Sequence, residues 1–226
     1  SLLSNNTLAG SSGQGGGGYE IERSLRFNSA DSAYLNRTPS SAGNKLVWTW
    51  SAWVKRNTIG ENQSLFGSAV SNTDDSMIFF TNDDYLRVWN YRSSGYKSHR
   101  ITNAKFRDPS AWYHIVVSCN GSTSLEMYVN GVQQTFQTGG VLNVGPDGTD
   151  WHFNTTREHN IGRQISYYYA NVQLADINWI DGQALAATDF GEYDDNNVWQ
   201  PIKYAGTYGT NGFHLDFSDT SSDAAL

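Results

Sequence analysis

Two aspartates, a tryptophan and a histidine gather in one glycine-rich stretch of the sequence. Asp147, Asp150, Trp151 and His152 lie within residues 139–156, GGVLNVGPDGTDWHFNTT. An aromatic ring can stack on the apolar face of a sugar, and carboxylates are the hard oxygen ligands that Ca²⁺ prefers. Long loops on a rigid scaffold often carry function, so we predict a binding site here, with Asp147 and Asp150 as candidate metal ligands. The alternative is that Trp151 only pins the loop to the core.

A second stretch, residues 90–105, combines aromatic and basic side chains. Its sequence, NYRSSGYKSHRITNAK, contains Tyr91, Arg92, Tyr96, His99 and Arg100. Aromatic faces stack on sugars and arginine makes forked hydrogen bonds, so these residues could form a contact surface. The alternative is an ordinary exposed rim of amphipathic side chains. The complete set of predicted carbohydrate-binding residues is Trp89, Tyr91, Tyr96, Trp151 and Tyr168.

No motif in the sequence supports a bound metal. There is no D-x-D-x-D-G calcium loop, and no two histidines have the spacing of zinc ligands. We expect Asp74-Asp75 in a loop and Asp83-Asp84 in a turn, and we interpret both pairs as solvated residues. We therefore predict no cofactor, and Ca²⁺ remains an option that only the acidic loops suggest.

The signatures of common catalytic centres are also missing from the sequence. It contains no G-x-S-x-G, no H-E-x-x-H and no G-x-x-x-x-G-K-[ST] motif. Its glutamates are isolated from one another. We therefore predict that the protein is not an enzyme, although a pair of carboxylates contributed by distant strands stays open as an alternative.

The elements that must position these residues are strands. From Trp112 to Val132, WYHIVVSCNGSTSLEMYVNGV, apolar residues alternate in two runs. A period of two residues predicts strands and not a helix. Asn120-Gly121 and Asn130-Gly131 supply residue types that tight turns favour, so the sequence predicts a long hairpin here.

Other segments also have strand character. Val47 to Lys55 has apolar residues on both faces, which predicts a central strand. The apolar pattern changes phase near Ala175-Asp176, which predicts a bulge, and residues 184–189 are expected to form a short helical turn over Phe190. Three more strands are predicted at residues 63–69, 76–81 and 85–89.

Length and composition favour a single all-β domain. The chain has 226 residues, of which 14% are aromatic, 16% are charged and 22 are glycine, and this suits many short strands and turns. The net charge of −7 argues against a nucleic-acid partner. No stretch of about 20 apolar residues exists for membrane insertion. The one cysteine, Cys119, ends an apolar run and is expected to be a buried, inert thiol.

The sequence divides into three regions. Residues 1–18 are rich in Ser, Asn and Gly, and such a segment is predicted to be flexible. It is either a linker or an arm that orders against a neighbouring subunit, with Leu2, Leu3 and Leu8 as assembly anchors. Residues 19–219 are predicted to form the folded domain, and residues 220–226 begin a polar C-terminal segment.

Several motifs together resemble the laminin-G-like domains of the concanavalin A-like superfamily. They are LEMYVNGV at 125–132, WTWSAWVKR at 48–56, HNIGRQ at 159–164 and VQLADINWIDGQAL at 172–185. The resemblance implies an all-β fold: a two-sheet antiparallel jelly-roll sandwich of the concanavalin A-like lectin/glucanase type. It also implies that the first strand pairs with a C-terminal strand at 213–217. The E-x-D-x-E motif of the related glucanases is missing, which argues against a distant glycanase.

A narrower likeness extends from Tyr19 to Asp219. The segments YEIERSLRFNSADSAYLNRTPSSAGN, INWIDGQALAATDFGE and YGTNGFHLDFSD resemble a virion-protein family of tailed bacteriophages. This resemblance implies a non-enzymatic virion structural protein, either a head fibre or decoration protein or a tail-fibre component, assembled in the host cytoplasm. It further implies docking to other virion proteins through the arm, a homo-oligomer with a trimer favoured, and contact with host-surface glycans. The alternative is a lectin-like receptor-binding domain that binds carbohydrate.

Overall fold

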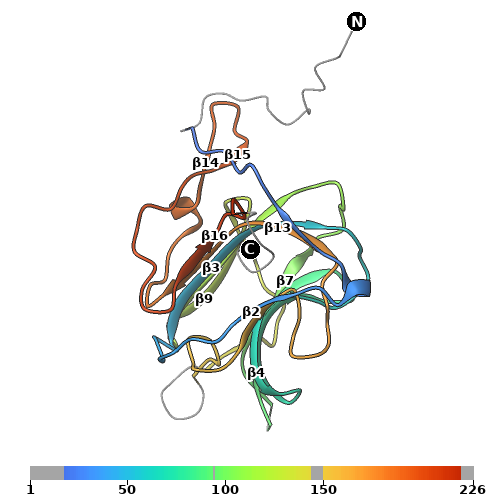
Figure 1. Cartoon of the computed structure of the whole chain (residues 1–226), viewed down its shortest axis with the longest axis vertical. Coiled ribbons are helices and arrows are strands. Elements are labelled where there is room, and N and C mark those ends of the chain that lie inside the picture. Colours follow the sequence, from blue (N-terminus) through green and yellow to red (C-terminus); the bar gives the residue numbers. More distant parts are fainter. Residues whose placement is uncertain (1–17, 94, 144–149, 220–226) are drawn as a thin grey trace, which may run out of the picture.

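Two seven-stranded antiparallel sheets pack face to face in the computed structural model of the chain (Figure 1). The structure describes residues 18–93, 95–143 and 150–219. The predicted anchors Leu2, Leu3 and Leu8 and the segment 220–226 lie outside the described residues. None of the helical turns in the described ranges has the length or apolar character of a membrane span.

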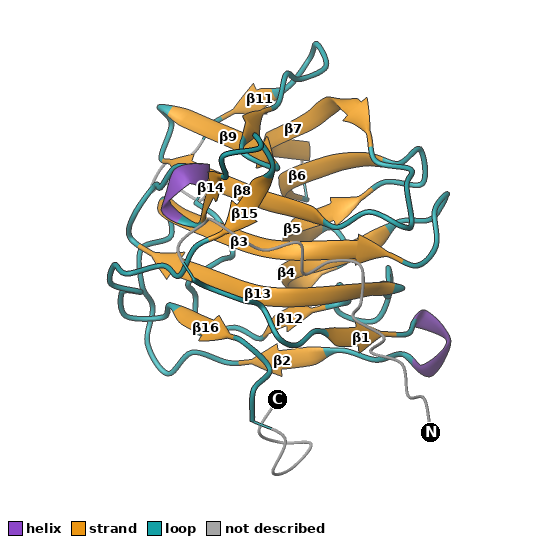
Figure 2. Ribbon diagram, turned by 90° about the horizontal axis from the view of Figure 1, so that it is seen from above, coloured by secondary structure: helices purple, strands orange, loops and turns teal. Residues whose placement is uncertain are grey.

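The first sheet has the strand order β1-β13-β3-β8-β9-β10, with β16 also paired to β13. Its strands are β1 (Leu25–Phe27), β3 (Val47–Arg56), β8 (Tyr113–Asn120), β9 (Ser124–Val129), β10 (Val132–Gln133), β13 (Val172–Asp181) and β16 (Phe213–Leu215). Figure 2 shows the strands of the two sheets running across the view, one sheet in front of the other.

The second sheet has the strand order β11-β7-β6-β5-β4-β12-β2. Its strands are β2 (Leu35–Arg37), β4 (Gln63–Ser71), β5 (Asp74–Phe80), β6 (Tyr85–Arg92), β7 (Gly95–Lys105), β11 (Val141–Leu142) and β12 (His159–Ile161). A separate small hairpin pairs β14 (Gly191–Tyr193) with β15 (Trp199–Pro201). The predicted all-β, two-sheet jelly-roll sandwich is therefore confirmed.

The predicted hairpin lies at the middle of the first sheet. β8 pairs antiparallel with β9, and β3 lies between β8 and β13, as its two-sided apolar pattern predicted. Trp48, Trp50 and Val54 alternate along β3 and belong to the core between the sheets. Trp53 lies on the opposite face of the strand, against a second apolar cluster.

β13 contains the predicted bulge. Its register with β3 shifts between Ala175 and Asn178, and Asp176 has a φ of 48°. β1 pairs with residues 172–174 and β16 with residues 177–179, one on each side of the bulge. The expectation that the first strand pairs with the C-terminal strand is therefore wrong. Both terminal strands lie in the first sheet, but each pairs with its own half of β13 because the bulge interrupts the shared edge.

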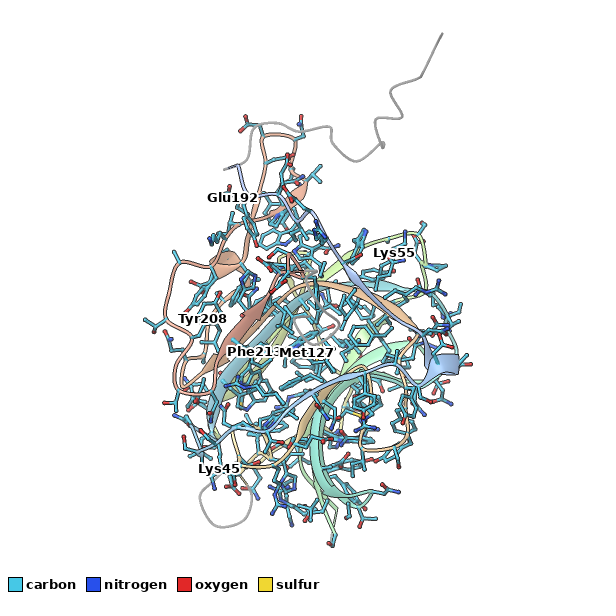
Figure 3. The ribbon with its side chains drawn as sticks, viewed as in Figure 1. Lys45, Lys55, Met127, Glu192, Tyr208 and Phe213 are labelled. Carbon is cyan, nitrogen blue, oxygen red and sulfur yellow. The ribbon has the colours of Figure 1, made fainter. Side chains whose placement is uncertain are left out.

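The core between the sheets is built from closely packed aromatic rings. The ring of Trp48 meets Trp151 and Phe153 edge-on, at 5.1 and 5.0 Å between centroids, and stacks on Trp179 at 5.4 Å. All four side chains are buried, and Figure 3 shows side chains filling the space between the sheets. Because each such ring removes about 150–250 Å² from water, this cluster is a main source of stability.

The second apolar cluster covers the outer face of the first sheet. Residues 182–204 cross back over this face and carry the helical turn η2 (Ala187–Asp189) and the β14–β15 hairpin, which projects at the top of Figure 1. The predicted helical turn and the burial of Phe190 are confirmed. The buried members of the cluster are Val116, Ile180, Ala187, Phe190 and Trp199.

Two expectations about single polar residues have opposite outcomes. Cys119 is buried as expected, and burial raises the pKa of its thiol to about 12, so the thiolate needed for reactivity is scarce at neutral pH. Asp84 was expected in a solvated turn, but only 5% of it is exposed and it lies 3.0 Å from the guanidinium of Arg56. Arg56 is fully buried and requires a counter-charge, which Asp84 supplies.

The carboxylate of Asp181 joins four segments that are far apart in the sequence. It accepts hydrogen bonds from the backbone N–H of Asn44 at 2.7 Å, the side-chain amide of Asn154 at 2.9 Å and the backbone N–H of Asn211 at 3.0 Å. The Asn154 amide also donates to the Asn44 carbonyl at 2.7 Å and accepts from the Trp179 indole at 2.8 Å. These contacts connect the start of β3, the loop before β12, the end of β13 and the loop before β16. We call this set of contacts the Asp181 junction.

The exchange Asp181→Asn tests the junction. The asparagine side chain carries an NH₂ donor in place of one acceptor oxygen of the aspartate. This donor would face the N–H donors of the junction, so we expect a loss of about 2–3 kcal/mol in the free energy of unfolding. Urea unfolding followed by tryptophan fluorescence measures this loss. The matched control is Asp195→Asn in the exposed β14–β15 turn, for which a change within about 0.5 kcal/mol is expected. Equal effects of the two exchanges would contradict the role of the junction.

Candidate functional site

Three rows of side chains cross the outer face of the second sheet, where β5, β6 and β7 are neighbours. Residues at paired positions point to the same face, and Ile78 and Val88 at the alternating positions belong to the core. Trp89, Tyr91 and Tyr96, three of the predicted carbohydrate-binding residues, therefore come together on the outer face. The rows are Asp75–Tyr91–Tyr96, Met77–Trp89–His99 and Phe79–Arg87–Ile101.

Five of these residues form what we call the aromatic face: Arg87, Trp89, Tyr91, Tyr96 and His99. Tyr96 lies at its centre and is 39% exposed. Its ring centroid is 5.8 Å from Trp89, 4.9 Å from Tyr91 and 4.6 Å from His99. The guanidinium of Arg87 lies 4.8 Å from the Trp89 ring and 4.7 Å from the Tyr96 ring. Cation–π contacts of this kind hold the charged group against the rings, so the face is preorganised.

Two polar atoms of the aromatic face are left without partners. Nε of Arg87 and Nδ1 of His99 are buried and make no hydrogen bond within the described part of the chain. Burial, together with the nearby charges of Arg87 and Arg100, lowers the pKa of His99, so its imidazole is neutral at physiological pH. Buried polar groups normally find a partner in protein or ordered water, and neither of these two atoms is exposed to a ligand in this arrangement.

Residues 164–168 form a strap over the same sheet, beside the aromatic face. The side-chain amide of Gln164 donates to Asp75 at 2.6 Å, and the ring of Tyr168 stacks on Phe79 with centroids 6.2 Å apart. A Cβ at Gly67 would lie 2.1 Å from Oε1 of Gln164, so glycine on β4 is what lets Gln164 cross the strand. Tyr168 is thus half-buried as a cover for Phe79, next to the aromatic face and not within it.

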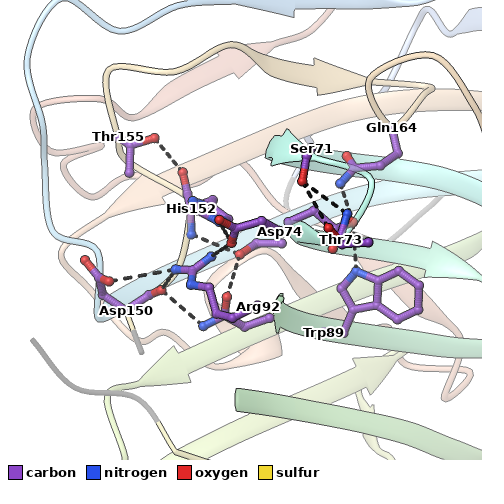
Figure 4. Close-up of polar contacts among 12 residues, drawn as sticks. Ser71, Thr73, Asp74, Trp89, Arg92, Asp150, His152, Thr155 and Gln164 are labelled. Atoms are coloured by element: carbon purple, nitrogen blue, oxygen red, sulfur yellow. Dashed lines mark hydrogen bonds and ion pairs between the residues drawn. The ribbon is translucent and has the colours of Figure 1, made fainter. Parts of the chain in front are cut away.

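Asp75 is a buried acid beneath the strap and the aromatic face. It is 1% exposed and accepts hydrogen bonds from Gln164 at 2.6 Å and from the Trp89 indole at 3.2 Å. Figure 4 labels the two donor residues, Gln164 and Trp89. Burial raises the pKa of this carboxyl to about 6, although both hydrogen bonds oppose the rise. The expectation that Asp74-Asp75 are solvated loop residues is therefore wrong. Both belong to β5, and the strap shields Asp75 from water.

The loop that was the first candidate for binding ends inside the protein. Trp151 is fully buried, and its ring stacks on Phe153 with centroids 5.7 Å apart and planes 4° from parallel. Its indole therefore cannot meet a sugar, and the prediction that Trp151 binds carbohydrate is wrong. The alternative, that Trp151 pins the loop to the core, is confirmed, since a large apolar ring gains more from burial than from exposure.

The carboxylates near this loop are already paired with neighbouring side chains. Asp150 pairs with Lys45. It also lies 3.8 Å from Arg92, and Asp74 binds Arg92 at 3.1 Å and His152 at 2.7 Å (Figure 4). No cluster of His, Cys, Asp or Glu within the described ranges could hold a metal ion. Asp147 lies outside the described residues. A calcium site formed by Asp147 and Asp150 therefore stays a prediction.

A buried serine and histidine resemble a nucleophile and its base, but their hydrogen bonds run the wrong way. Ser51 Oγ is 2.9 Å from Nε2 of His114, and the indole N–H of Trp199 donates to Nδ1 of the same ring at 2.9 Å. Because an indole can only donate, Nδ1 is the acceptor and Nε2 carries the hydrogen. Burial lowers the pKa of His114 to about 3, so the ring donates to Ser51 and cannot activate it.

Sequence reasoning missed two residues of the site, for different reasons. Arg87 is two positions from Trp89, so the strand period that predicted β6 already placed both on one face. Asp75 had no comparable signal. Its burial depends on Gln164, which lies 89 residues away in the sequence.

The raised pKa of Asp75 predicts a specific pH dependence of stability. The folded state binds this proton more tightly than the unfolded chain, whose aspartate pKa is near 3.9, so stability falls as the pH rises from about 4 to about 6. The loss is at most about 3 kcal/mol. The variant Asp75→Asn keeps an acceptor for Gln164 and Trp89 and should lack this decline. Urea unfolding of both proteins between pH 4 and 7 measures it, and parallel pH curves would contradict the assignment.

Comparisons with known proteins agree with this architecture. A family model described as the concanavalin A-like lectin/glucanases superfamily, of the laminin-G type, matches residues 27–189. No curated protein sequence matches the chain. Domains LG4-5 of the mouse laminin α1 chain superpose with a TM-score of 0.52 at 11% identity, over 84% of this chain and 45% of the laminin chain.

Two other solved structures are similar at lower scores. A heptameric SAP-like pentraxin from Limulus polyphemus has a TM-score of 0.45 at 16% identity, over 68% of this chain and 71% of its own. A Trypanosoma rangeli sialidase has a TM-score of 0.44 at 16% identity, over 64% of this chain and 22% of its own. The protein thus spans less than half of the laminin and sialidase chains. Since the family model covers most of the chain and the two-sheet architecture fits it, the protein belongs to the concanavalin A-like lectin/glucanases superfamily as a laminin-G-like jelly-roll domain.

Proposed function

We propose that the protein is a non-enzymatic recognition module of a tailed-phage virion that contacts glycans through its aromatic face. The observation that carries the binding proposal is the group of packed, partly exposed rings formed by Trp89, Tyr91 and Tyr96. Exposed aromatic rings held by a rigid sheet suit the apolar face of a sugar ring, because little side-chain freedom is lost on binding.

The polar groups of the aromatic face favour a glycan with an acidic substituent. Arg87 forms no ion pair with any carboxylate in the described part of the chain, and its Nε lacks a hydrogen-bond partner. A guanidinium is the preferred partner of a carboxylate or sulfate because it offers two parallel N–H donors. The ring of His99 packs against Tyr96 and is neutral, so it adds no competing charge beside Arg87.

A binding role without catalysis fits the residues near the face. The buried Asp75 is enclosed by Gln164 and Trp89, so it lacks the access to a glycosidic oxygen that a general acid requires. On the other sheet, the Ser51–His114 pair is held in the inactive tautomer by Trp199. We therefore propose that the protein acts by recognition and carries out no reaction.

The virion assignment is supported by the sequence resemblance between Tyr19 and Asp219 and not by the fold. In this proposal the protein is a head fibre or decoration protein or a tail-fibre component, and its N-terminal arm docks onto other virion proteins. Closed symmetry is usual for such assemblies, so we propose a homo-oligomer, with a trimer favoured. The runner-up function is a receptor-binding domain with the same aromatic face as its binding surface.

Alanine exchanges test the aromatic face. Screening on a glycan array, followed by calorimetry with the best acidic oligosaccharide, should show that Trp89→Ala and Tyr96→Ala each weaken binding at least about tenfold. Arg87→Gln should weaken binding of the acidic glycan more than that of its neutral analogue. The control is Tyr193→Ala on the β14–β15 hairpin, which is 46% exposed and should leave affinity unchanged. Unaltered binding by the Trp89 and Tyr96 variants would place the site elsewhere.

Electron microscopy of the parent virion tests the location. A gold-labelled antibody to this domain should mark intact particles if the protein is a virion component. Label on the capsid would identify a head fibre or decoration protein, and label at distal tail fibres would favour the receptor-binding domain. Intact particles without label would refute the virion assignment and leave the glycan-binding proposal to its own test.

A further inference from the structure

A cavity of about 360 Å³ opens between the sheets where β2 and β16 face each other. Five of its nine lining residues are apolar side chains from both sheets: Leu35 on β2, Phe66 on β4, Ile161 on β12, and Phe213 and Leu215 on β16. A concave, mostly apolar cavity of about 300–1,000 Å³ is typical of small-molecule sites. The cavity is separate from the aromatic face, none of whose residues lines it.

The cavity follows from the way the terminal strands are placed. β16 has three residues and pairs with only one half of β13, so this strand contributes only Phe213 and Leu215 to the cover of the core. Gly212 adds bare backbone to the wall. A Cβ there would lie 1.8 Å from the carbonyl oxygen of Tyr208, so no side chain can fill the space from this position.

His159, on the inner wall of the cavity, has no free hydrogen-bonding group for a ligand. Its Nδ1 is 2.8 Å from the Arg157 carbonyl and its Nε2 accepts from the Asn154 N–H at 3.0 Å, so both ring nitrogens are satisfied. Burial lowers the pKa of His159 to about 4, and the ring is neutral at physiological pH. The interior of the cavity is therefore suited to an apolar group.

Arg37 places a positive charge at the mouth of the cavity. The guanidinium of Arg37 lies 5.4 Å from the centroid of the Phe213 ring and donates to the Asn211 carbonyl at 2.8 Å. Arg37 is exposed and forms no ion pair with a described carboxylate. Glu158, which directly precedes the strand paired with β2, is itself paired with Arg163 at 3.1 Å and with the Asn36 amide at 3.1 Å. The charge of Arg37 is thus available to an anion.

We propose that this cavity binds a small amphiphile, such as a medium-chain carboxylate, with its apolar chain between the sheets and its carboxylate on Arg37. The apolar walls contributed by Leu35, Phe213 and Leu215 gain from covering an alkyl chain, because each methylene is removed from water. The head group gains a charge-assisted hydrogen bond at the mouth. A saccharide does not fit these walls, because its hydroxyl groups would be buried without partners.

Calorimetry with decanoate and with 1-decanol tests both parts of the proposal. Decanoate should bind the wild-type protein saturably with one site per chain. Leu35→Trp places a larger side chain in the cavity and should weaken decanoate binding at least about tenfold. Leu215→Trp fills the same space from the opposite sheet and should have the same effect, and urea unfolding of both variants verifies that they are folded.

Arg37→Gln tests the head group. The glutamine keeps a donor for the Asn211 carbonyl but removes the charge, so binding of decanoate should weaken at least about fivefold while binding of 1-decanol stays within about twofold. The matched control is Arg26→Gln on β1, an exposed arginine outside the cavity, which should leave both affinities unchanged. Absence of saturable decanoate binding, or full binding by both folded tryptophan variants, would overturn the site. Equal weakening of both ligands by Arg37→Gln would overturn the carboxylate assignment.

Discussion

The arrangement of the sandwich depends on one buried carboxylate, that of Asp181. Its three donors come from segments before β3, before β12 and before β16, so a single group fixes the relative positions of strands that are distant in sequence. Most pairings in this fold are non-local, and such contacts carry a large loop-closure cost. The Asp181 junction concentrates the compensating interactions at one point. It also holds Asn211, whose carbonyl in turn fixes Arg37 at the mouth of the inter-sheet cavity.

The aromatic face shows a second kind of constraint, in which a binding surface is supported from below. Trp89 is tied through its indole to Asp75, and Asp75 is tied to Gln164 in the strap. Trp89 is therefore oriented by a hydrogen bond as well as by ring contacts with Phe79 at 4.6 Å. Support of this kind keeps the rings in one arrangement before a ligand arrives. The same contacts place a titratable group directly beneath the surface that we propose to bind glycans.

The sequence predicted the sheets better than the site. Alternation along 112–132 and the phase change at Ala175-Asp176 depend on local side-chain direction, and the structure has a hairpin and a bulge there. The sequence also placed Trp89, Tyr91 and Tyr96 near one another. It could not show that Trp151 is buried or that Asp75 is covered by the strap, because both outcomes depend on which distant segments cross the sheets. Arg87 was within reach, since strand period alone puts it beside Trp89.

The second apolar cluster, on the outer face of the first sheet, shows that the folding unit continues beyond the family match. The family match stops at residue 189, yet Trp199 covers Val116 and Ile180 and fixes the His114 ring. A polypeptide cut at the family boundary would expose this apolar surface together with the outer face of a sheet. Exposed patches of this kind lead to self-association. The minimal soluble unit of the protein is therefore longer than the segment that defines its family.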